Sequence, residues 1–162
     1  MITHENGLFH LKNENLSLLF RITRYGLLEQ LHFGTPVEDG DAEALACRPG
    51  KGWGSSLLLN DKDTSSCPDA MSLAWSDSGR GDFRESPLEM DGKSTNFTYV
   101  NHKVLKNAPA MQSGLPQATD GGETLAIVME QAGLRLTLYF TLFETAMTRR
   151  CVLENTGGKM VE

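Results

Sequence analysis

Apolar and polar residues alternate with a period of two in two well-separated parts of the chain, residues 16–23 and 134–142. In the first, Leu16, Leu18, Phe20 and Ile22 share one face, whereas Ser17, Arg21 and Thr23 share the other; Leu19 breaks the pattern. In the second, Leu134, Leu136, Leu138, Phe140 and Leu142 oppose Arg135, Thr137, Tyr139 and Thr141. Successive side chains of a strand point to opposite faces of its sheet, so both segments are predicted to be half-buried strands.

Further strands are predicted at residues 27–33, 124–130 and 148–154, each next to turn-forming residues. Tyr25-Gly26 would close a hairpin between the strands at residues 16–23 and 27–33. Asn6-Gly7, Asp91-Gly92 and Asp120-Gly121 mark more turns, because these pairs tolerate the positive φ of tight reversals. Many short strands joined by tight turns predict an all-β fold, an antiparallel β-sandwich, and not a fold of alternating strands and helices.

Residues 38–80 show no such alternation and are rich in Gly, Ser, Asp and Pro, so a long irregular loop is expected there. A short helix is expected near residues 69–74. Irregular connections longer than about 12–15 residues are uncommon in compact domains and often carry function. Because Trp53 and Trp75 lie in this stretch, we expect it to dock onto a partner or contact a ligand.

Composition narrows the classes of function. A chain of 162 residues with ordinary apolar content predicts one hydrophobic core. A net charge of −6 without a cluster of basic residues argues against nucleic-acid binding. No signal-peptide pattern and no apolar window of about 18 residues occurs, so we expect neither export nor membrane insertion. Cys47, Cys67 and Cys151 form no Cys-x-x-Cys pair and are predicted to be reduced thiols of a cytoplasmic protein.

The chain contains side chains of the types used in catalysis, but their sequence surroundings do not indicate a catalytic role. Glycoside hydrolysis needs a pair of carboxyl groups, and the acidic residues of the irregular stretch and its exit include Asp61, Asp63, Asp69, Asp82 and Glu85. Nothing around them indicates the burial that would shift a carboxyl pKa, so no catalytic residue is predicted. The four histidines, His4, His10, His32 and His102, lack the spacing of a metal site, and neither metal nor cofactor is expected. A Ser-His-Asp assembly stays open, although no Gly-x-Ser-x-Gly elbow is present.

Two glycine-containing motifs have structural alternatives. Gly50–Ser56 lacks the Walker spacing for a phosphate loop. Its Trp53 could stack on a sugar, pack into a neighbouring subunit or join the core. In Gly79–Pro87, a structural pair of Asp and Arg at the loop exit is favoured over ligand contact, with Phe83 buried.

An ordered series of short segments resembles the beginning of the α-galactosidases of glycoside hydrolase family 36, nearly from end to end. The segments are Phe9-His10-Leu11, Leu19-Phe20-Arg21, Tyr25-Gly26-Leu27-Leu28, His32-Phe33-Gly34, Gly81-Asp82-Phe83-Arg84-Glu85-Ser86-Pro87, Tyr99-Val100-Asn101-His102, Gly114-Leu115-Pro116-Gln117-Ala118, Glu123-Thr124-Leu125, Leu136-Thr137-Leu138-Tyr139-Phe140-Thr141 and Leu153-Glu154-Asn155-Thr156-Gly157-Gly158. Lys51-Gly52-Trp53-Gly54-Ser55-Ser56 is most similar to the enzymes of lactic acid bacteria and related Firmicutes.

The resemblance implies a fold and a division of labour. Such enzymes cleave terminal α-1,6-linked galactose from melibiose, raffinose and stachyose with two aspartates of a central (β/α)8 barrel, which follows an N-terminal β-supersandwich. Residues 1–162 would then be the first part of that supersandwich, a truncated domain with the catalytic barrel absent and no chemistry of its own.

The resemblance also implies partners. Family members are often tetramers, in which a loop of one subunit's N-terminal domain borders the active site of its neighbour. The expected partners are therefore other copies of the chain and, through the full-length enzyme, α-galactoside oligosaccharides. Trp53, and then Asp61 or Asp63, are the expected substrate-binding residues in a neighbouring subunit's site. The alternatives are a freestanding carbohydrate-binding β-sandwich module and an unrelated β-sandwich interaction protein.

Overall fold

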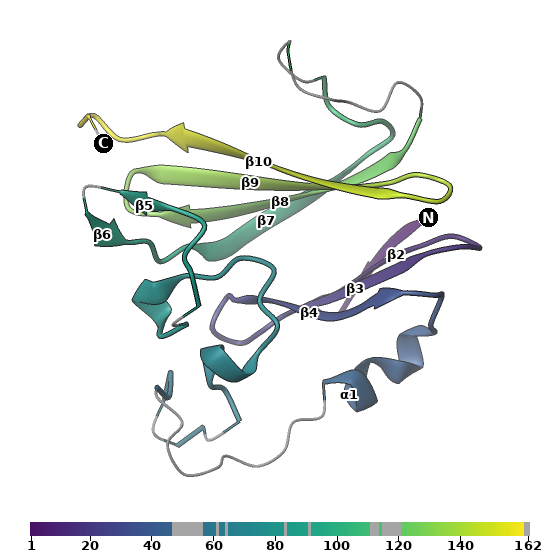
Figure 1. The fold of residues 1–162 in the computed structure, drawn as a ribbon, viewed down its shortest axis with the longest axis horizontal. Helices are drawn as coiled ribbons and strands as arrows, with labels where there is room; N and C mark the ends of the chain where they lie inside the picture. The colour runs from purple at the N-terminus through teal and green to yellow at the C-terminus, as the bar shows by residue number, and fades with distance from the viewer. Residues whose placement is uncertain are drawn as a thin grey trace.

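Two antiparallel sheets of four strands each lie face to face in the computed structural model (Figure 1). The structure describes residues 1–46, 57–60, 62–63, 65–82, 84–90, 92–110, 114 and 121–160. The first sheet, in the order β1-β2-β3-β4, contains β1 (Ile2–Glu5), β2 (Leu8–Lys12), β3 (Ser17–Ile22) and β4 (Leu28–Gly34). The second, in the order β10-β9-β8-β7, contains β7 (Thr98–Leu105), β8 (Glu123–Gln131), β9 (Leu134–Leu142) and β10 (Met147–Asn155).

Short elements connect the two sheets. A two-stranded hairpin consists of β5 (Glu89–Met90) and β6 (Lys93–Ser94). The helical turns are η1 (Asp39–Asp41), α1 (Ala42–Leu45), η2 (Pro68–Ala70) and η3 (Ser78–Arg80). None of the helices in the described ranges is long and apolar enough to cross a membrane. The all-β, antiparallel sandwich expected from the sequence is confirmed.

The hydrophobic core lies between the facing sheets. Phe9, Leu18 and Phe20 of the first sheet meet Ile127 and Phe140 of the second, and all five side chains are buried. The rings of Phe20 and Phe140 lie 4.6 Å apart between centroids. Burying a side chain of this size contributes about 1.5–3 kcal/mol, so the inward face of each strand supplies much of the stability.

The predicted strands are confirmed as β3, β4, β8, β9 and β10, whereas β1, β2 and β7 were not predicted. β1 is too short and polar to show a period. In β7 the ladder shifts register between Tyr99 and Asn101, so alternation does not persist along the strand.

The expectation that β3 is buried on one face only is wrong. Ser17 and Leu19 have no exposed surface, although they lie on the face opposite Leu18 and Phe20. His10, which pairs with Leu19 across the ladder, contacts Asp39 of η1 over this outer face. Residues 39–45 thereby cover part of a surface that the sequence pattern assigns to solvent.

Residues 38–80 are largely irregular, as expected, but the helix expected at 69–74 ends at Ala70. The chain then pairs with the edge of β4, because the backbone N–H of Gln30 donates to Ser72 O at 2.7 Å and that of Ala74 to Leu28 O at 2.8 Å. This pairing places Trp75 in the core, edge-to-face against Phe97. Trp75 is therefore a core residue, with only 7% of its surface exposed, and offers no surface for the docking expected of this stretch.

Candidate functional site

The irregular stretch is attached to the first sheet before and after residues 47–56. Its start is held by two contacts: Lys12 of β2 pairs with Glu38 at 2.9 Å, and His10 pairs with Asp39. In Figure 1, η1 and α1 lie beside β4, on the side of the first sheet away from the second.

Ser17, His10 and Asp39 form a hydrogen-bonded chain that the sequence did not reveal. Since a carboxylate can only accept, Nδ1 of His10 donates to Asp39, and Nε2 lies 2.6 Å from the hydroxyl oxygen of Ser17. The order of groups is that of a serine hydrolase triad. However, Ser17 has no exposed surface, so a substrate carbonyl cannot reach its hydroxyl. The chain of bonds fastens the loop to the sheet, and residues this far apart in sequence give no local signal of it.

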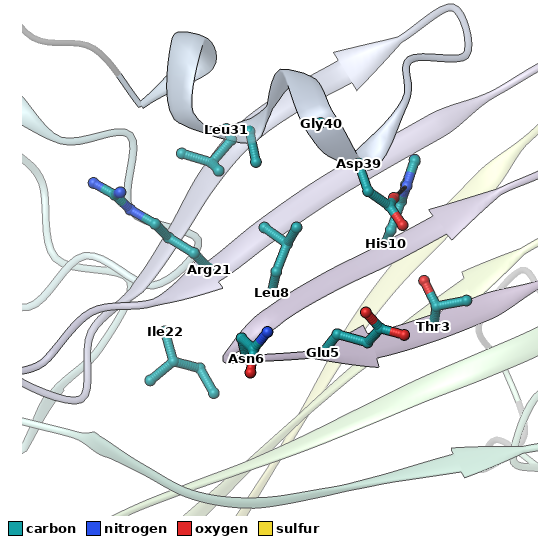
Figure 2. Close-up of a pocket in the computed structure, with 11 residues that line it drawn as sticks. Thr3, Glu5, Asn6, Leu8, His10, Arg21, Ile22, Leu31, Asp39 and Gly40 are labelled. Carbon is teal, nitrogen blue, oxygen red and sulfur yellow. Dashed lines mark hydrogen bonds and ion pairs between the residues drawn. The ribbon is translucent and has the colours of Figure 1, made fainter.

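A cavity of about 440 Å³ lies between the outer face of the first sheet and the helical turns η1 and α1. In Figure 2, Leu8 lies near its middle, His10 and Asp39 lie together on one side, and Arg21 lies on the other. Arg21 donates from Nε to Glu29 at 2.6 Å. The described lining contains no Phe, Tyr or Trp, so the cavity lacks the aromatic surface on which a sugar ring would stack.

Asp63, one of the predicted substrate-binding residues, is turned into its own chain. Its Oδ2 accepts from the hydroxyl of Tyr25 at 2.9 Å and pairs with Nη2 of Arg24 at 2.6 Å. Its Oδ1 accepts from the backbone N–H and the hydroxyl of Ser65. Hydrogen bonds from Ser66 and Ser65 hold the pKa of Asp63 far below its ordinary value of 3.8. Asp63 is thus an ionised anchor between the loop and the turn that precedes β4.

The pKa of Tyr25, which donates to Asp63, is shifted in the opposite direction. Burial, and then its hydrogen bond to Asp63, raise the pKa of the Tyr25 phenol above its ordinary value. The hydroxyl therefore keeps its proton and remains a donor to the carboxylate. Trp53 and Asp61, the other predicted substrate-binding residues, lie outside the described residues.

The exit of the stretch carries the Asp and Arg pair predicted from Gly79–Pro87. Oδ1 of Asp82 accepts from Nε of Arg84 at 2.8 Å, and Oδ2 accepts from Nη2 at 2.6 Å. Ser76 adds a third side-chain donor at 2.6 Å. Burial alone would raise the pKa of Asp82, but the hydrogen bonds from Arg84 and Ser76 outweigh it and lower that pKa. Phe83, which was expected to be buried, lies outside the described residues.

A third buried aspartate, Asp77, joins the loop to the segment before β7. It accepts from the backbone N–H of Phe97 at 2.7 Å, from Nε1 of Trp75 at 3.1 Å and from the hydroxyl of Thr95. Gly79 packs so closely here that an added Cβ would lie 2.5 Å from the carbonyl oxygen of Thr95. This role of Asp77 was not predicted from the sequence.

Neither Asp63 nor Asp82 has the electrostatics of a general acid. A general acid needs a raised pKa, whereas those of Asp63 and Asp82 are lowered. Asp69 accepts from the thiol of Cys67 at 2.5 Å, and Glu85 is exposed. In the part of the chain that the structure describes, no three His, Cys, Asp or Glu residues gather in a way that could hold a metal ion.

Fold and site together define a β-sandwich domain that carries a long loop fastened by buried aspartates. Residues 26–162 match the family model described as the glycosyl hydrolase family 36 N-terminal domain. The chain belongs to this family.

Similar proteins are consistent with that assignment. The chain is 26% identical to alpha-galactosidase Mel36A of Lactobacillus acidophilus and 26% identical to alpha-galactosidase 1 of Pediococcus pentosaceus, covering 97% and 99% of this chain. It spans 23% of the length of each.

Solved structures agree with the fold. The GH36 alpha-galactosidase AgaB from Geobacillus stearothermophilus has a TM-score of 0.83 at 26% identity, with 99% of this chain and 23% of that chain covered. A variant of AgaA from the same organism, solved in complex with raffinose, has a TM-score of 0.82 at 28% identity, with 95% and 23% covered.

Proposed function

We propose that the chain is the non-catalytic N-terminal domain of an α-galactosidase, in which a barrel elsewhere in a longer polypeptide hydrolyses terminal α-1,6-galactosides. Residues 1–162 then form part of a larger supersandwich. The observation that carries the proposal is the state of Asp63 and Asp82. Both carboxylates are buried, ionised and bonded to donors of their own chain, which suits a supporting role.

The irregular stretch has a specific part in this proposal. Asp39 fixes the chain before residues 47–56 and Asp63 fixes it after them. Fixed ends lower the entropy lost when the segment between them binds. The segment with Trp53 would border the active site of a neighbouring copy, with Trp53 and Asp61 as the galactoside contacts. Asp63 enters as an anchor, because its oxygens already have donors.

Self-association and location complete the proposal. Oligomerisation brings a neighbouring active site within reach of the stretch. A cytoplasmic location is supported by Cys67 and Cys151, which are both free thiols.

Turnover of a chromogenic α-galactoside by the purified chain tests the division of labour. We expect no hydrolysis above buffer, and no difference between the unaltered chain and Asp82→Asn. Reproducible turnover that is lost in Asp82→Asn or Glu85→Gln would place chemistry in this domain and contradict the proposal. The reading frame beyond codon 162 gives an independent test, because it should encode a barrel with two well-placed aspartates.

Calorimetry with galactose, melibiose and raffinose separates the supporting role from a freestanding carbohydrate-binding module. We expect no saturable heat from the isolated chain, because the neighbouring active site is missing. Saturable binding that Trp53→Ala abolishes would favour the module. Leu57→Ala, an exposed apolar change near the same segment, is the matched control.

A further inference from the structure

A second cavity, of about 260 Å³, lies where the irregular stretch meets the end of β3. One wall comes from the end of β3 and the turn after it, and the other comes from Ser65, Ser66 and Met71. Among the described residues that line it, Arg21 and Arg24 are positively charged and none is acidic. A cavity with two guanidinium groups in its lining is suited to an oxyanion, because a guanidinium matches the geometry of carboxylate and phosphate groups.

The carboxylates that pair with these two arginines are more deeply buried than the arginines are. Arg21 donates from Nε to Glu29, and the side chain of Arg21 is 30% exposed whereas that of Glu29 is 5% exposed. Arg24 pairs through Nη2 with Asp63, and the exposed fractions of these two side chains are 66% and 7%. An anion that enters the cavity therefore meets the guanidinium side of each ion pair before the carboxylate side.

Both arginines keep N–H donors for a ligand. Among the described residues, the hydrogen-bond partner of the Arg21 side chain is Glu29, which takes only Nε. The contact of Arg24 with Asp63 is made by Nη2 and leaves Nε and Nη1 without a hydrogen-bond partner in the described part of the chain. Because a guanidinium is a planar fork of donors, each arginine can give more than one hydrogen bond to the same phosphate group.

Hydroxyl groups add polar contacts beside the guanidinium groups. The hydroxyl oxygen of Thr23 accepts from the backbone N–H of Leu27 at 3.1 Å, which leaves its own proton to donate to a ligand. Ser66 donates to Asp63, so its oxygen can still accept a hydrogen bond. Because a water molecule takes up about 30 Å³ of the liquid, a cavity of about 260 Å³ holds more than a bare phosphate ion. The cavity therefore has room for a phosphate ester with hydroxyl groups of its own.

We propose that this cavity binds a phosphate group, free or carried by a small hydroxylated metabolite, with Arg21 and Arg24 as its cationic contacts. Arg24 also pairs with Asp63, the anchor of the irregular stretch, so the bound group would lie between that anchor and the end of β3. A ligand stabilises the arrangement to which it binds, and occupancy would therefore hold Asp63 and its loop more firmly. The binding is independent of the proposed function, whereas an effect on a neighbouring active site would rest on it.

Amide NMR of the isotope-labelled chain tests the location without any substitution. Inorganic phosphate, added at constant pH and ionic strength, should shift the signals of Arg24 and Ser65 saturably in the millimolar range, while the signal of Arg135 on β9 stays in place. Glucose 6-phosphate, compared with glucose, distinguishes the two sources of the group. Tighter binding of glucose 6-phosphate than of phosphate assigns the site to an ester, equal affinities assign it to the free ion, and either result supports the site. No saturable shift with either phosphate, equal shifts at Arg135, or the same shifts with glucose would overturn it.

Arginine variants test the two contacts. Arg21→Gln and Arg24→Gln should each weaken phosphate binding about tenfold or more, because each removes charge-assisted hydrogen bonds. Arg135→Gln is the matched control and should leave the affinity unchanged, since it also breaks a bond from an arginine Nε to a carboxylate, here to Glu130 at 2.9 Å. Circular dichroism confirms that each variant is folded. If Arg24→Gln unfolds, Arg24→Lys keeps a charge beside Asp63 but loses the planar fork, and it should still weaken binding. Unchanged affinity in either cavity variant, or an equal loss in the control, would overturn the site.

Discussion

Arg84 donates to the carboxylate of Asp82 from two nitrogens, and Asp82 has no exposed surface, so the loop ends in a two-point ion pair whose carboxylate is buried. Charge-assisted bidentate pairs of this kind hold a defined geometry better than single hydrogen bonds. Here the pair closes a stretch that has little regular structure of its own.

Asp82→Asn should lower the free energy of unfolding by about 1–3 kcal/mol, because an amide cannot accept all of the bonds from Arg84 and Ser76. Urea denaturation followed by circular dichroism measures the change. Glu85→Gln, at an exposed neighbouring carboxyl, should shift stability by less than about 0.5 kcal/mol. Equal effects of the two changes on stability would contradict a special role for the pair of Asp82 and Arg84.

Acid should destabilise the domain through Asp63. Its folded-state pKa is depressed, so its contribution is complete above the ordinary value of 3.8 and is lost as the pH falls below it. Unfolding free energies measured from pH 7 down to pH 2 should therefore decline below about pH 4. Asp63→Asn should be less stable at pH 7 and should show a shallower decline. An unchanged slope in this variant would assign acid sensitivity elsewhere.

A second loss of stability is expected between pH 7 and pH 5, from His102. Burial, and then the nearby His4, lower the pKa of His102, so the folded state favours the neutral ring. Stability is complete above the unfolded pKa of about 6.5 and falls as the pH drops below it. Thermal melts of His102→Gln should depend less on pH in this window. His32→Gln, at a ring that bonds the carbonyl of Thr35 in the adjacent turn, is the control and should keep the original slope.

Gly79→Ala should destabilise the domain by about 1–3 kcal/mol, because the new methyl group would lie 2.5 Å from the carbonyl oxygen of Thr95. The contact is with backbone, which cannot rotate away. Gly158→Ala meets no atom within 4 Å and should leave the denaturation midpoint almost unchanged. If Gly79→Ala left the free energy of unfolding unchanged, the loop would not be packed closely against residues 95–97.

Phe20→Ala should cost about 3–5 kcal/mol, because it leaves a cavity against Phe140 at the contact between the two sheets. Phe33→Ala removes a ring that is 56% exposed and should cost far less. Denaturant midpoints of the two variants measure the difference directly. Similar losses would contradict the placement of Phe20 between the sheets.

Two of the predicted strands, β3 and β9, were found because their alternation continues across several residues. Residues 134–142 alternate along the whole of β9, and that strand is confirmed at the predicted bounds. β7 was not predicted, because its register shifts after Tyr99 and interrupts the alternation. Ser17 was assigned to the exposed face because a period of two shows that a face is polar. It does not show whether residues from elsewhere in the chain cover that face.

The contacts of the candidate site likewise include some that could be predicted from the sequence and some that could not. The pairing of Asp82 with Arg84 was predictable, because the two residues are neighbours and their charges are opposite. The inward orientation of Asp63 was not, since Tyr25 and Arg24 are distant in sequence. The roles of Asp77 and His10 likewise depend on partners that only the folded chain brings close.

By itself, the sequence determined that this chain forms antiparallel strands with one apolar face, because the two-residue period of side chains is a local property of extended backbone. Only the tertiary structure decided which acidic residues face inward, which face of β3 is covered and that Trp75 lies in the core. Each of these depends on contacts between segments far apart in sequence, and such contacts leave no local pattern.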